Sequence, residues 1–189
     1  MWSSEVTNMI ITGIWETLYM TLVSTLVGYV IGLPMGIILT VSDKDGIKPN
    51  AVLYKILDVI ANIVRSVPFI ILLVLLIPFT RLVVGKSYGS TATIVPLVIA
   101  AAPYIARMVE SSLKEVDAGV IEAARSMGAS NFTIITKVML VEARTSLLVG
   151  ATITLGTILG YSAMSGAVGG GGLGAIAIRY GYTLSLIHI

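Results

Sequence analysis

The stretch DAGVIEAARSMG, residues 117–128, lies between two long apolar segments and is the most informative part of this chain. Asp117 is a favourable helix N-cap, and Gly128 is the residue type that most readily ends a helix in the left-handed conformation. Residues 118–127 are therefore expected to form a short helix with one apolar side. That side carries Val120, Ile121, Ala124 and Met127 at three- and four-residue spacing.

A second short helix is expected directly after the first. Ser130 can cap it, and the helical pattern runs on into Lys137. The two helices would meet at an elbow at Gly128, and the small side chains of Ala123 and Ala124 would let another backbone come close to the first helix. The stretch therefore has the character of a docking element.

The composition places the chain in a membrane. Of 189 residues, 56% are hydrophobic and 12% are charged, and the mean hydropathy is +0.97. Soluble domains carry about 25% charged residues. The net charge of +2 is too small to indicate nucleic-acid binding, and the absence of cysteine excludes disulfides and thiolate chemistry. The single histidine, His188, is a poor catalytic candidate so near the end of the chain, and neither a catalytic nor a metal site is expected.

Four apolar runs have the length of about 20 residues that a transmembrane helix requires. They cover roughly residues 17–41, 56–79, 92–109 and 145–168. Pro68 lies inside the second run, where it removes one backbone hydrogen bond and allows a kink. The sequence thus predicts an all-α integral membrane protein.

The basic residues predict the orientation of these spans, because Lys and Arg are enriched in cytoplasmic loops. The loops after the first and third spans hold Lys44, Lys48, Lys55, Lys114, Arg125 and Lys137. The loop between the second and third spans holds only Arg81 and Lys86. The N-terminus is therefore expected outside, and the loop that carries Glu122 in the cytoplasm.

The docking element resembles the cytoplasmic coupling loop of bacterial ABC-importer permeases. The pattern of that family is Glu-Ala-Ala, three residues, Gly, nine residues, then Ile-x-Leu-Pro. Val138 and Val141 replace its Ile and Pro, which weakens the expected break before the next helix. The matching positions are Glu122, Ala123, Ala124, Gly128 and Leu140. The resemblance implies a coupling loop at about residues 110–142 that docks a separate ATPase.

Further segments are similar to permeases of methionine importers, in the bacterial inner membrane. They are Gly32 to Gly36, Arg65 to Phe69, Asp117 to Ser130 and the glycine-rich segment up to Tyr182. The resemblance implies a homodimer with two cytoplasmic ATPase subunits and an external binding protein. ATP and Mg would then bind to the ATPase, with no enzymatic site and no cofactor on this chain. A permease for another amino acid or small solute, and a secondary transporter or channel subunit, stay open as alternatives.

The same resemblance implies five spans per subunit, of which four are complete here. Residues 1–182 are expected to form a single permease domain, and residues 183–189 an atypical tail left by truncation. A genuine four-span protein with an external tail is the alternative.

Small and polar residues inside the spans are candidates for the translocation pathway or for a dimer interface. They are Arg65, Gly156, Gly160 and Met164. Arg65 shares a helix side with Asp58 and Asn62, and the alternative places all three near the lipid headgroups. Met164 either closes the pathway or fills space between helices. Gly28, Gly32 and Gly36 offer a second close-packing surface, either within one subunit or between two.

Overall fold

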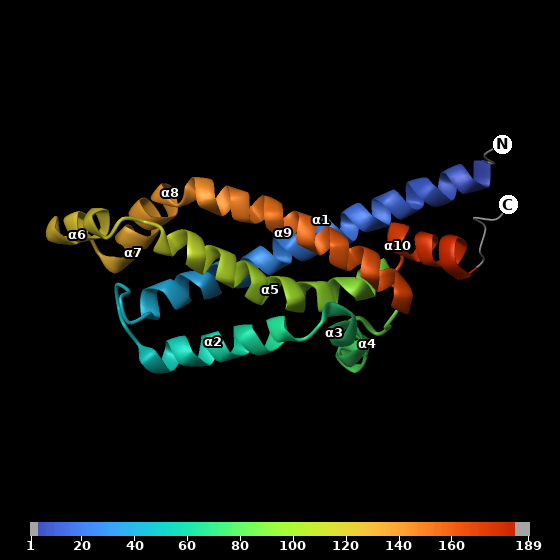
Figure 1. The fold of residues 1–189 in the computed structure, drawn as a ribbon, viewed down its shortest axis with the longest axis horizontal. Helices are drawn as coiled ribbons and strands as arrows, with labels where there is room; N and C mark the ends of the chain where they lie inside the picture. Colours follow the sequence, from blue (N-terminus) through green and yellow to red (C-terminus); the bar gives the residue numbers. More distant parts are fainter. Residues whose placement is uncertain (1–3, 184–189) are drawn as a thin grey trace. The chain divides into compact units, whose positions relative to one another are not determined.

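The computed structural model describes residues 4–183. Every regular element in that range is a helix (Figure 1), as the apolar runs predict. Three helices are long and apolar enough to cross a membrane: α1 (Ser4–Ser42), α5 (Ser90–Lys114) and α9 (Arg144–Ser165), which the short 3-10 turn η2 (Gly166–Val168) extends. A fourth span is possible if α2 (Ala51–Ser66) and α3 (Phe69–Leu75) are taken together.

The remaining elements are short. They are α4 (Ile77–Val84), α6 (Ala118–Ser126), α7 (Asn131–Thr133), the π-helix η1 (Ile134–Met139), α8 (Leu140–Glu142), α10 (Gly172–Ile176) and the π-helix η3 (Ala177–Thr183).

Two of the expected spans differ from the observed helices. The first helix starts at Ser4 and not near residue 17, since no residue before the apolar run breaks a helix. The second run is not continuous, because α2 ends at Ser66 and Pro68 is the N-cap of α3. Proline has no N–H to donate and disfavours helical geometry in the residue before it. The kink expected at Pro68 is therefore a complete break.

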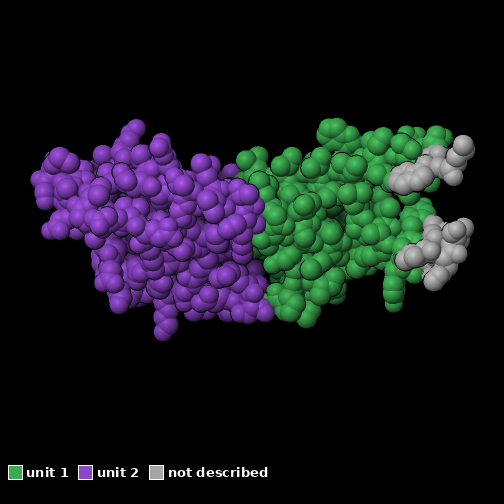
Figure 2. All heavy atoms as spheres, turned by 45° about the horizontal axis from the view of Figure 1, so that its top comes forward, with its two compact units in different colours: residues 1–27, 67–101, 155–189 green, residues 28–66, 102–154 purple. Residues whose placement is uncertain are grey.

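The chain forms two compact units (Figure 2), and α1, α5 and α9 each contribute to both. Unit 1 consists of residues 1–27, 67–101 and 155–189, and unit 2 of residues 28–66 and 102–154. The docking element and α2 belong to unit 2. The single permease domain expected over residues 1–182 stays a prediction, and the tail from residue 184 lies outside the described residues.

Close backbone packing of α1 on α5 forms the core of unit 2. A Cβ atom added at Gly32 would lie 2.5 Å from the Ala102 carbonyl oxygen, and one at Gly36 would lie 2.6 Å from the Ala106 carbonyl oxygen. Ile105 and Val109 fill the space between these positions and are almost completely buried. Gly32 and Gly36 therefore serve internal packing within one subunit, one of the two roles that the sequence left open.

Replacing Gly32 by alanine is expected to destabilise the permease, because the added carbon meets backbone oxygen rather than a movable side chain. Overpacking of this kind costs about 1–3 kcal/mol. Thermal unfolding of the detergent-solubilised protein should show a lowered midpoint. Gly181→Ala is the matched control, since a Cβ at Gly181 meets nothing within 4 Å. Equal midpoints for the two variants would contradict the close packing of α1 on α5.

A glycine-rich turn organises unit 1. Gly169, Gly171 and Gly172 all have positive φ angles near 70–85°, which L side chains rarely adopt. The Gly172 amide donates to Glu16 Oε2 at 2.6 Å, and the next amide donates to Thr17 Oγ1 at 2.9 Å. Glu16 is the acidic residue just before the expected first span, and its carboxylate accepts here from the Gly172 amide of the turn.

Candidate functional site

The docking helix α6 forms as its sequence predicts. Asp117 is the N-cap, and its Oδ1 accepts from the Gly119 amide at 2.7 Å. The helix ends at Ser126 and Gly128 follows with φ +81°, so the left-handed elbow is confirmed. The Gly128 amide donates to the Arg125 carbonyl at 3.0 Å, which closes the end of the helix.

The segment after the elbow is also helical. Ser130 caps α7, with its Oγ accepting from the Thr133 amide at 3.2 Å. The expected run into Lys137 is confirmed, although residues Ile134–Met139 form a π-helix. Helical backbone then continues through α8 into α9 with only Ala143 between them, which agrees with the weak break expected from Val141.

The apolar side of α6 is only partly covered by its own chain. Ala124 is buried and Ile121 is half-buried, whereas Val120 is exposed and Met127 is 82% exposed. Two of the four residues on the expected apolar side, Ile121 and Ala124, thus pack against the described part of the chain, and the other two are exposed to solvent. Glu122 and Ala123 are exposed as well, so the motif residues other than Ala124 are available to another protein.

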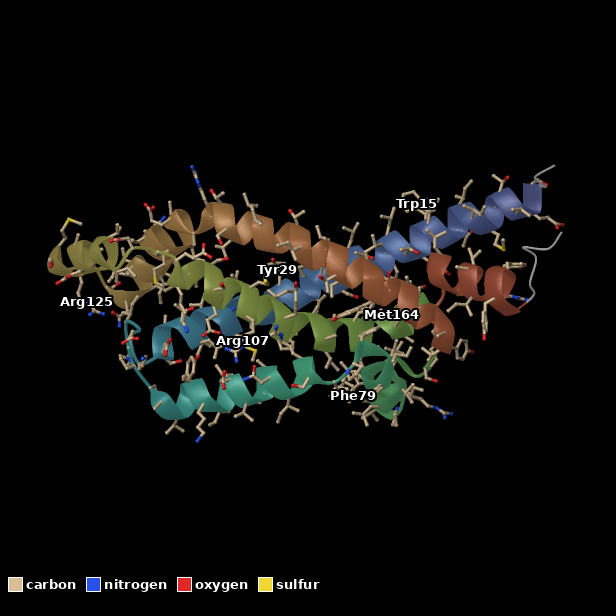
Figure 3. All side chains as sticks on the ribbon, in the orientation of Figure 1. Trp15, Tyr29, Phe79, Arg107, Arg125 and Met164 are labelled. Carbon is tan, nitrogen blue, oxygen red and sulfur yellow. The ribbon has the colours of Figure 1, made fainter. Side chains whose placement is uncertain are left out.

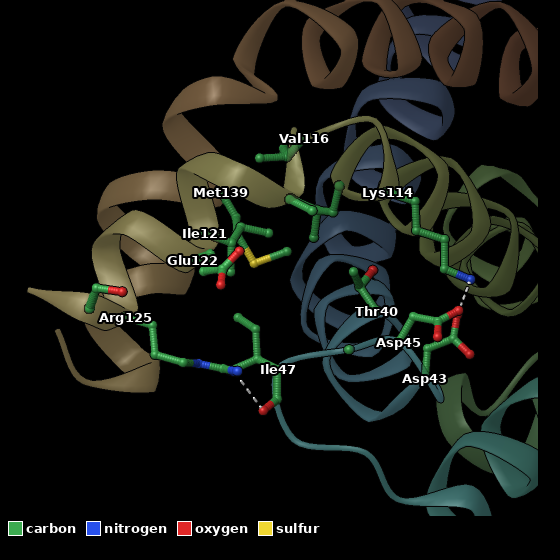
Figure 4. Close-up of a pocket in the computed structure, with 14 residues that line it drawn as sticks. Thr40, Asp43, Asp45, Ile47, Lys114, Val116, Ile121, Glu122, Arg125 and Met139 are labelled. Atoms are coloured by element: carbon green, nitrogen blue, oxygen red, sulfur yellow. Dashed lines mark hydrogen bonds and ion pairs between the residues drawn. The ribbon is translucent and has the colours of Figure 1, made fainter. Parts of the chain in front are cut away.

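A cavity of about 690 Å³ lies beside α6 (Figure 4). Its walls are the loop after α1, the end of α5, the inner side of α6, and Met139. Arg125 reaches across from α6 and donates to the Ile47 carbonyl at 3.0 Å. The docking helix is thereby tied to the loop that connects α1 and α2.

A chain of ion pairs in unit 2 was not predicted from the sequence. Arg107 on α5 donates to Glu110 at 2.6 Å and also binds the Asp58 carboxylate on α2. Lys114 binds both Glu110 and Asp43 at 2.7 Å. The Glu110 side chain is only 6% exposed, so its charge is compensated by these two cations. The signal in the sequence is the spacing of Arg107, Glu110 and Lys114, three and four residues apart on one helix side.

Asp58 therefore faces another helix and not the lipid headgroups alone. The amide oxygen of Asn62 also accepts from Arg107, at 3.1 Å. Asp58 and Asn62 thus have a protein partner, and their depth relative to the lipid headgroups stays a prediction.

Asp43, in the loop after α1, has a pKa below its usual value because the Lys114 ammonium hydrogen-bonds its carboxylate. The lowered pKa means that the folded state favours the ionised form. This contribution to stability is present above the ordinary carboxyl pKa and is lost as the pH falls through the lowered value.

The four candidate pathway residues are divided between the two compact units, and Met164 lies on α9 (Figure 3). Arg65 belongs to unit 2, where its guanidinium carbon lies 6.0 Å from the centre of the Tyr104 ring. Gly156, Gly160 and Met164 belong to unit 1 and all three are exposed. A Cβ added at either glycine would meet nothing within 4 Å, so internal packing does not require glycine at these positions.

Comparisons with known proteins agree with this architecture. Residues 28–186 match the family model of the binding-protein-dependent transport system inner membrane component. The chain is 49% identical over 181 residues to a probable D-methionine transport system permease protein MetI of Vibrio cholerae, covering 96% of this chain and 80% of that protein. It is 56% identical over 158 residues to the D-methionine transport system permease protein MetI of Escherichia coli K12, covering 84% of this chain and 73% of that protein.

Solved structures give the same result. A crystal form of the MetNI methionine ABC transporter in inward-facing conformations matches with a TM-score of 0.95 at 54% identity, over 96% of this chain and 84% of that chain. An amino acid ABC transporter crystallised with histidines shares the fold, with a TM-score of 0.75 at 24% identity, over 95% of this chain and 81% of that chain. The chain therefore belongs to the family of binding-protein-dependent transport system inner membrane components and has the fold of an ABC-importer permease.

Proposed function

We propose that this chain is the permease subunit of an ATP-driven methionine importer. It would form the path through the membrane and would not itself be an enzyme. The observation that carries the proposal is the capped helix α6, which presents Glu122 and Ala123 to solvent and ends at the left-handed Gly128. The names of the relatives, all D-methionine transport permeases, support methionine as the substrate.

The partners follow from the same elements. Two copies of the chain would assemble with two cytoplasmic ATPase subunits and an extracytoplasmic substrate-binding protein, and ATP and Mg would bind to the ATPase. Met127 and Phe132 flank the elbow and are 82% and 74% exposed. Large apolar side chains exposed next to each other in a polar loop are typical of a protein contact surface. We assign this surface, together with Glu122, Ala123 and Gly128, to the ATPase, and Ala124 to the buried side of α6 that holds the docking helix in place.

The orientation of the chain in the membrane is supported by the contact between Arg125 and the Ile47 carbonyl. Because the two loops touch, they lie on the same side of the membrane. Both loops are rich in lysine or arginine, as cytoplasmic loops are. The N-terminus, one span away from Ile47, then faces the outside.

Co-expression with the neighbouring ATPase and binding protein of the importer tests the function. The permease should retain the ATPase through purification. Vesicles that contain the complex should transport methionine only when ATP is present on the side of the membrane that carries the ATPase subunits and the binding protein is present on the opposite side. Uptake of a different amino acid with no methionine uptake would keep an ABC permease and reject methionine. Uptake driven by an ion gradient without ATPase would reject the proposal in favour of a secondary transporter.

A second copy of the chain is the proposed neighbour of α9. Gly156 and Gly160 are exposed with open space beside them, and they lie among exposed apolar side chains such as Leu155 and Leu159. In a bilayer, exposed small residues at four-residue spacing favour close helix contact. The side of α9 that carries these glycines would therefore lie near the dimer axis or along the pathway, with Arg65 as a further pathway candidate.

Cysteines introduced at Gly156 or Gly160 are expected to form disulfides between subunits, in at least one nucleotide state. The chain contains no cysteine of its own, so the background is clean. Non-reducing gels of the complex, with and without ATP, measure the product. A cysteine at Leu82, which is 82% exposed on α4, is the control for collisional cross-linking. Equal yields from Leu82 and from both glycines would reject the interface on α9.

Met164 is proposed to close the outer end of the pathway. Its side chain is 49% exposed, and its sequence neighbours are small, so one flexible thioether could fill a narrow gap and exclude water. Met164→Ala should keep the complex assembled while ATP hydrolysis becomes less dependent on substrate. Lower thermal stability with tight coupling would instead identify Met164 as a packing residue.

A further inference from the structure

Two helices of unit 2 face each other through a row of polar and aromatic side chains, which we name the polar ladder. The ladder consists of Tyr54, Asp58, Asn62 and Arg65 on α2, and Tyr104, Arg107, Glu110 and Lys114 on α5. In each set the positions are three or four residues apart, so each set lies on one side of its helix. The contacts run in opposite order along the two helices, as expected for an antiparallel pair.

Arg107 is the central rung. Its Nη1 donates to Glu110 on the same helix at 2.6 Å. Its Nη2 reaches α2, where it binds the Asp58 carboxylate and the Asn62 amide oxygen, the latter at 3.1 Å. The Arg107 side chain is 17% exposed, so its charge is largely withdrawn from solvent. One planar guanidinium therefore joins two helices with a fixed geometry, which a flexible ammonium cannot reproduce.

At the end of the ladder nearest to the docking element, Tyr54 and Lys114 connect the ladder to the residue that follows α1. The Tyr54 hydroxyl donates to Glu110 at 3.2 Å, and the Lys114 ammonium lies 5.6 Å from the Tyr54 ring centre. Lys114 also binds Asp43 at 2.7 Å. At the opposite end Arg65 lies over the Tyr104 ring. The ladder thus extends over most of the length of α2.

Apolar packing contributes little to the attachment of α2. Of its 16 residues only Ala61 is buried, Leu57 and Val64 on the same side are half-buried, and the apolar residues of the other side are exposed. Val52, Ile56, Ile60 and Ile63 belong to that exposed set. In a membrane such residues contact lipid, and lipid provides no hydrophobic force that would press α2 onto α5. The narrow apolar contact of α2 leaves the polar ladder as the specific connection between α2 and α5.

The ladder is also close to the docking element in the chain. Lys114 is the last residue of α5, and α6 begins at Ala118. A displacement of α6 therefore acts on the end of α5 that carries Lys114, Glu110 and Arg107. The ladder offers a direct connection from that end to α2.

We propose that Arg107 is a positioning residue for transport coupling, which passes the movement of the docking helix from α5 to α2 through Asp58 and Asn62. This inference rests on the proposed function. A residue with this role should change how much substrate moves per ATP hydrolysed, which a residue needed only for folding would leave unchanged in the assembled protein. Among the described contacts Arg107 binds Glu110 on its own helix and Asp58 and Asn62 on α2, so its effect would be transmitted through α2.

The test uses the complete importer in vesicles and measures methionine uptake and ATP hydrolysis in the same preparation. Arg107→Gln keeps a polar side chain and removes the charge. We expect the uptake per ATP to fall about tenfold, which lies within the usual range of coupling between sites. Lys55→Gln is the matched control, because it removes an exposed cation of α2 outside the ladder, and its ratio should equal that of the unaltered protein.

A charge exchange adds a rescue arm. Arg107→Glu alone places a carboxylate against Asp58 and Glu110 and should reduce the ratio at least as much as Arg107→Gln. Combined with Asp58→Arg, which restores an opposite pair between α2 and α5, it should recover most of the lost ratio. Recovery of the uptake per ATP in the double variant would show that coupling requires an ion pair between α2 and α5 and not a particular residue at either position.

Tyr54→Phe keeps the inference testable if Arg107→Gln does not assemble. This change deletes one hydroxyl that bonds Glu110 and leaves the ring beside Lys114. We expect an assembled complex with only a slightly lower thermal midpoint and about a threefold lower ratio, the size of one hydrogen bond. An assembled Arg107→Gln complex with the normal ratio would overturn the inference, as would a normal ratio for Tyr54→Phe when Arg107→Gln fails to assemble. Failure of the unaltered complex to transport methionine would instead reject the proposed function.

Discussion

Replacing Gly128 with valine is expected to uncouple ATP hydrolysis from uptake while the complex still assembles. Gly128 has φ +81°, and a Cβ built there would meet nothing within 4 Å. A side chain at position 128 is therefore unfavourable because of the backbone conformation that it must adopt and not because of a steric clash. The left-handed conformation costs an L residue about 1–2 kcal/mol, and more for a β-branched side chain.

A strain of this size changes the population of the elbow about tenfold, since 1.4 kcal/mol corresponds to a factor of ten. The angle between α6 and the helices α7 and η1 would then change. Movement of the ATPase would consequently be transmitted to the membrane-spanning helices in a smaller fraction of hydrolysis cycles. Uptake per ATP in reconstituted vesicles is the measurement. Gly128→Asn is the control, because asparagine tolerates the left-handed region better than other residues with a side chain. A normal ratio for Gly128→Val would show that the elbow has no role in coupling.

The second large effect is expected at Glu110. Glu110→Ala leaves Arg107 and Lys114 close together with the shared carboxylate removed, and Arg107 stays largely withdrawn from solvent. Removing one partner of a fully buried ion pair costs about 3–5 kcal/mol, and the loss here should lie toward the lower end because Arg107 keeps Asp58 and Lys114 keeps Asp43. The yield of solubilised permease and its thermal midpoint should both fall strongly. Glu115→Ala is the control, since Glu115 is exposed on the same stretch of chain.

A double variant separates lost attraction from uncompensated charge. Arg107→Met with Glu110→Leu removes the most buried pair and keeps apolar volume, while Asp58 is 30% exposed to solvent and Lys114 keeps Asp43, so the double variant should be more stable than Glu110→Ala. If Glu110→Ala unfolds at the same temperature as Glu115→Ala, the ion pairs do not stabilise unit 2. If the double variant is the less stable one, the geometry of the pairs matters more than their charge balance.

The family comparisons confirm what the sequence motif implied about fold and membership. The docking loop could be predicted in detail because its determinants are local. An N-cap at Asp117, a left-handed glycine at position 128 and a second cap at Ser130 each act within one or two helical turns. Local determinants of this kind are readable from sequence, whereas the role of Gly156, Gly160, Met164 and Arg65 stays a prediction.

The attachment of α2 could not be read from the sequence in the same way. Asp58, Arg107 and Asp43 are far apart along the chain, and only tertiary structure brings them together. The spacing of Arg107, Glu110 and Lys114 identifies a helix side but not its partner. The same holds for Gly32 and Gly36, whose spacing fits contact within one subunit or between two.

The sequence by itself determined that the chain has apolar helices long enough to span a membrane, where the two docking helices start at their caps, and where a glycine bends the docking loop. These properties depend on apolar length, on capping groups and on backbone conformation, all of which are local. The tertiary structure alone decided that Gly32 lies against the Ala102 carbonyl and that polar groups connect α2 to α5. Each of these results depends on which helix sides pack against each other. Helical periodicity in a sequence identifies one side of a helix, but it does not identify the element that packs on that side.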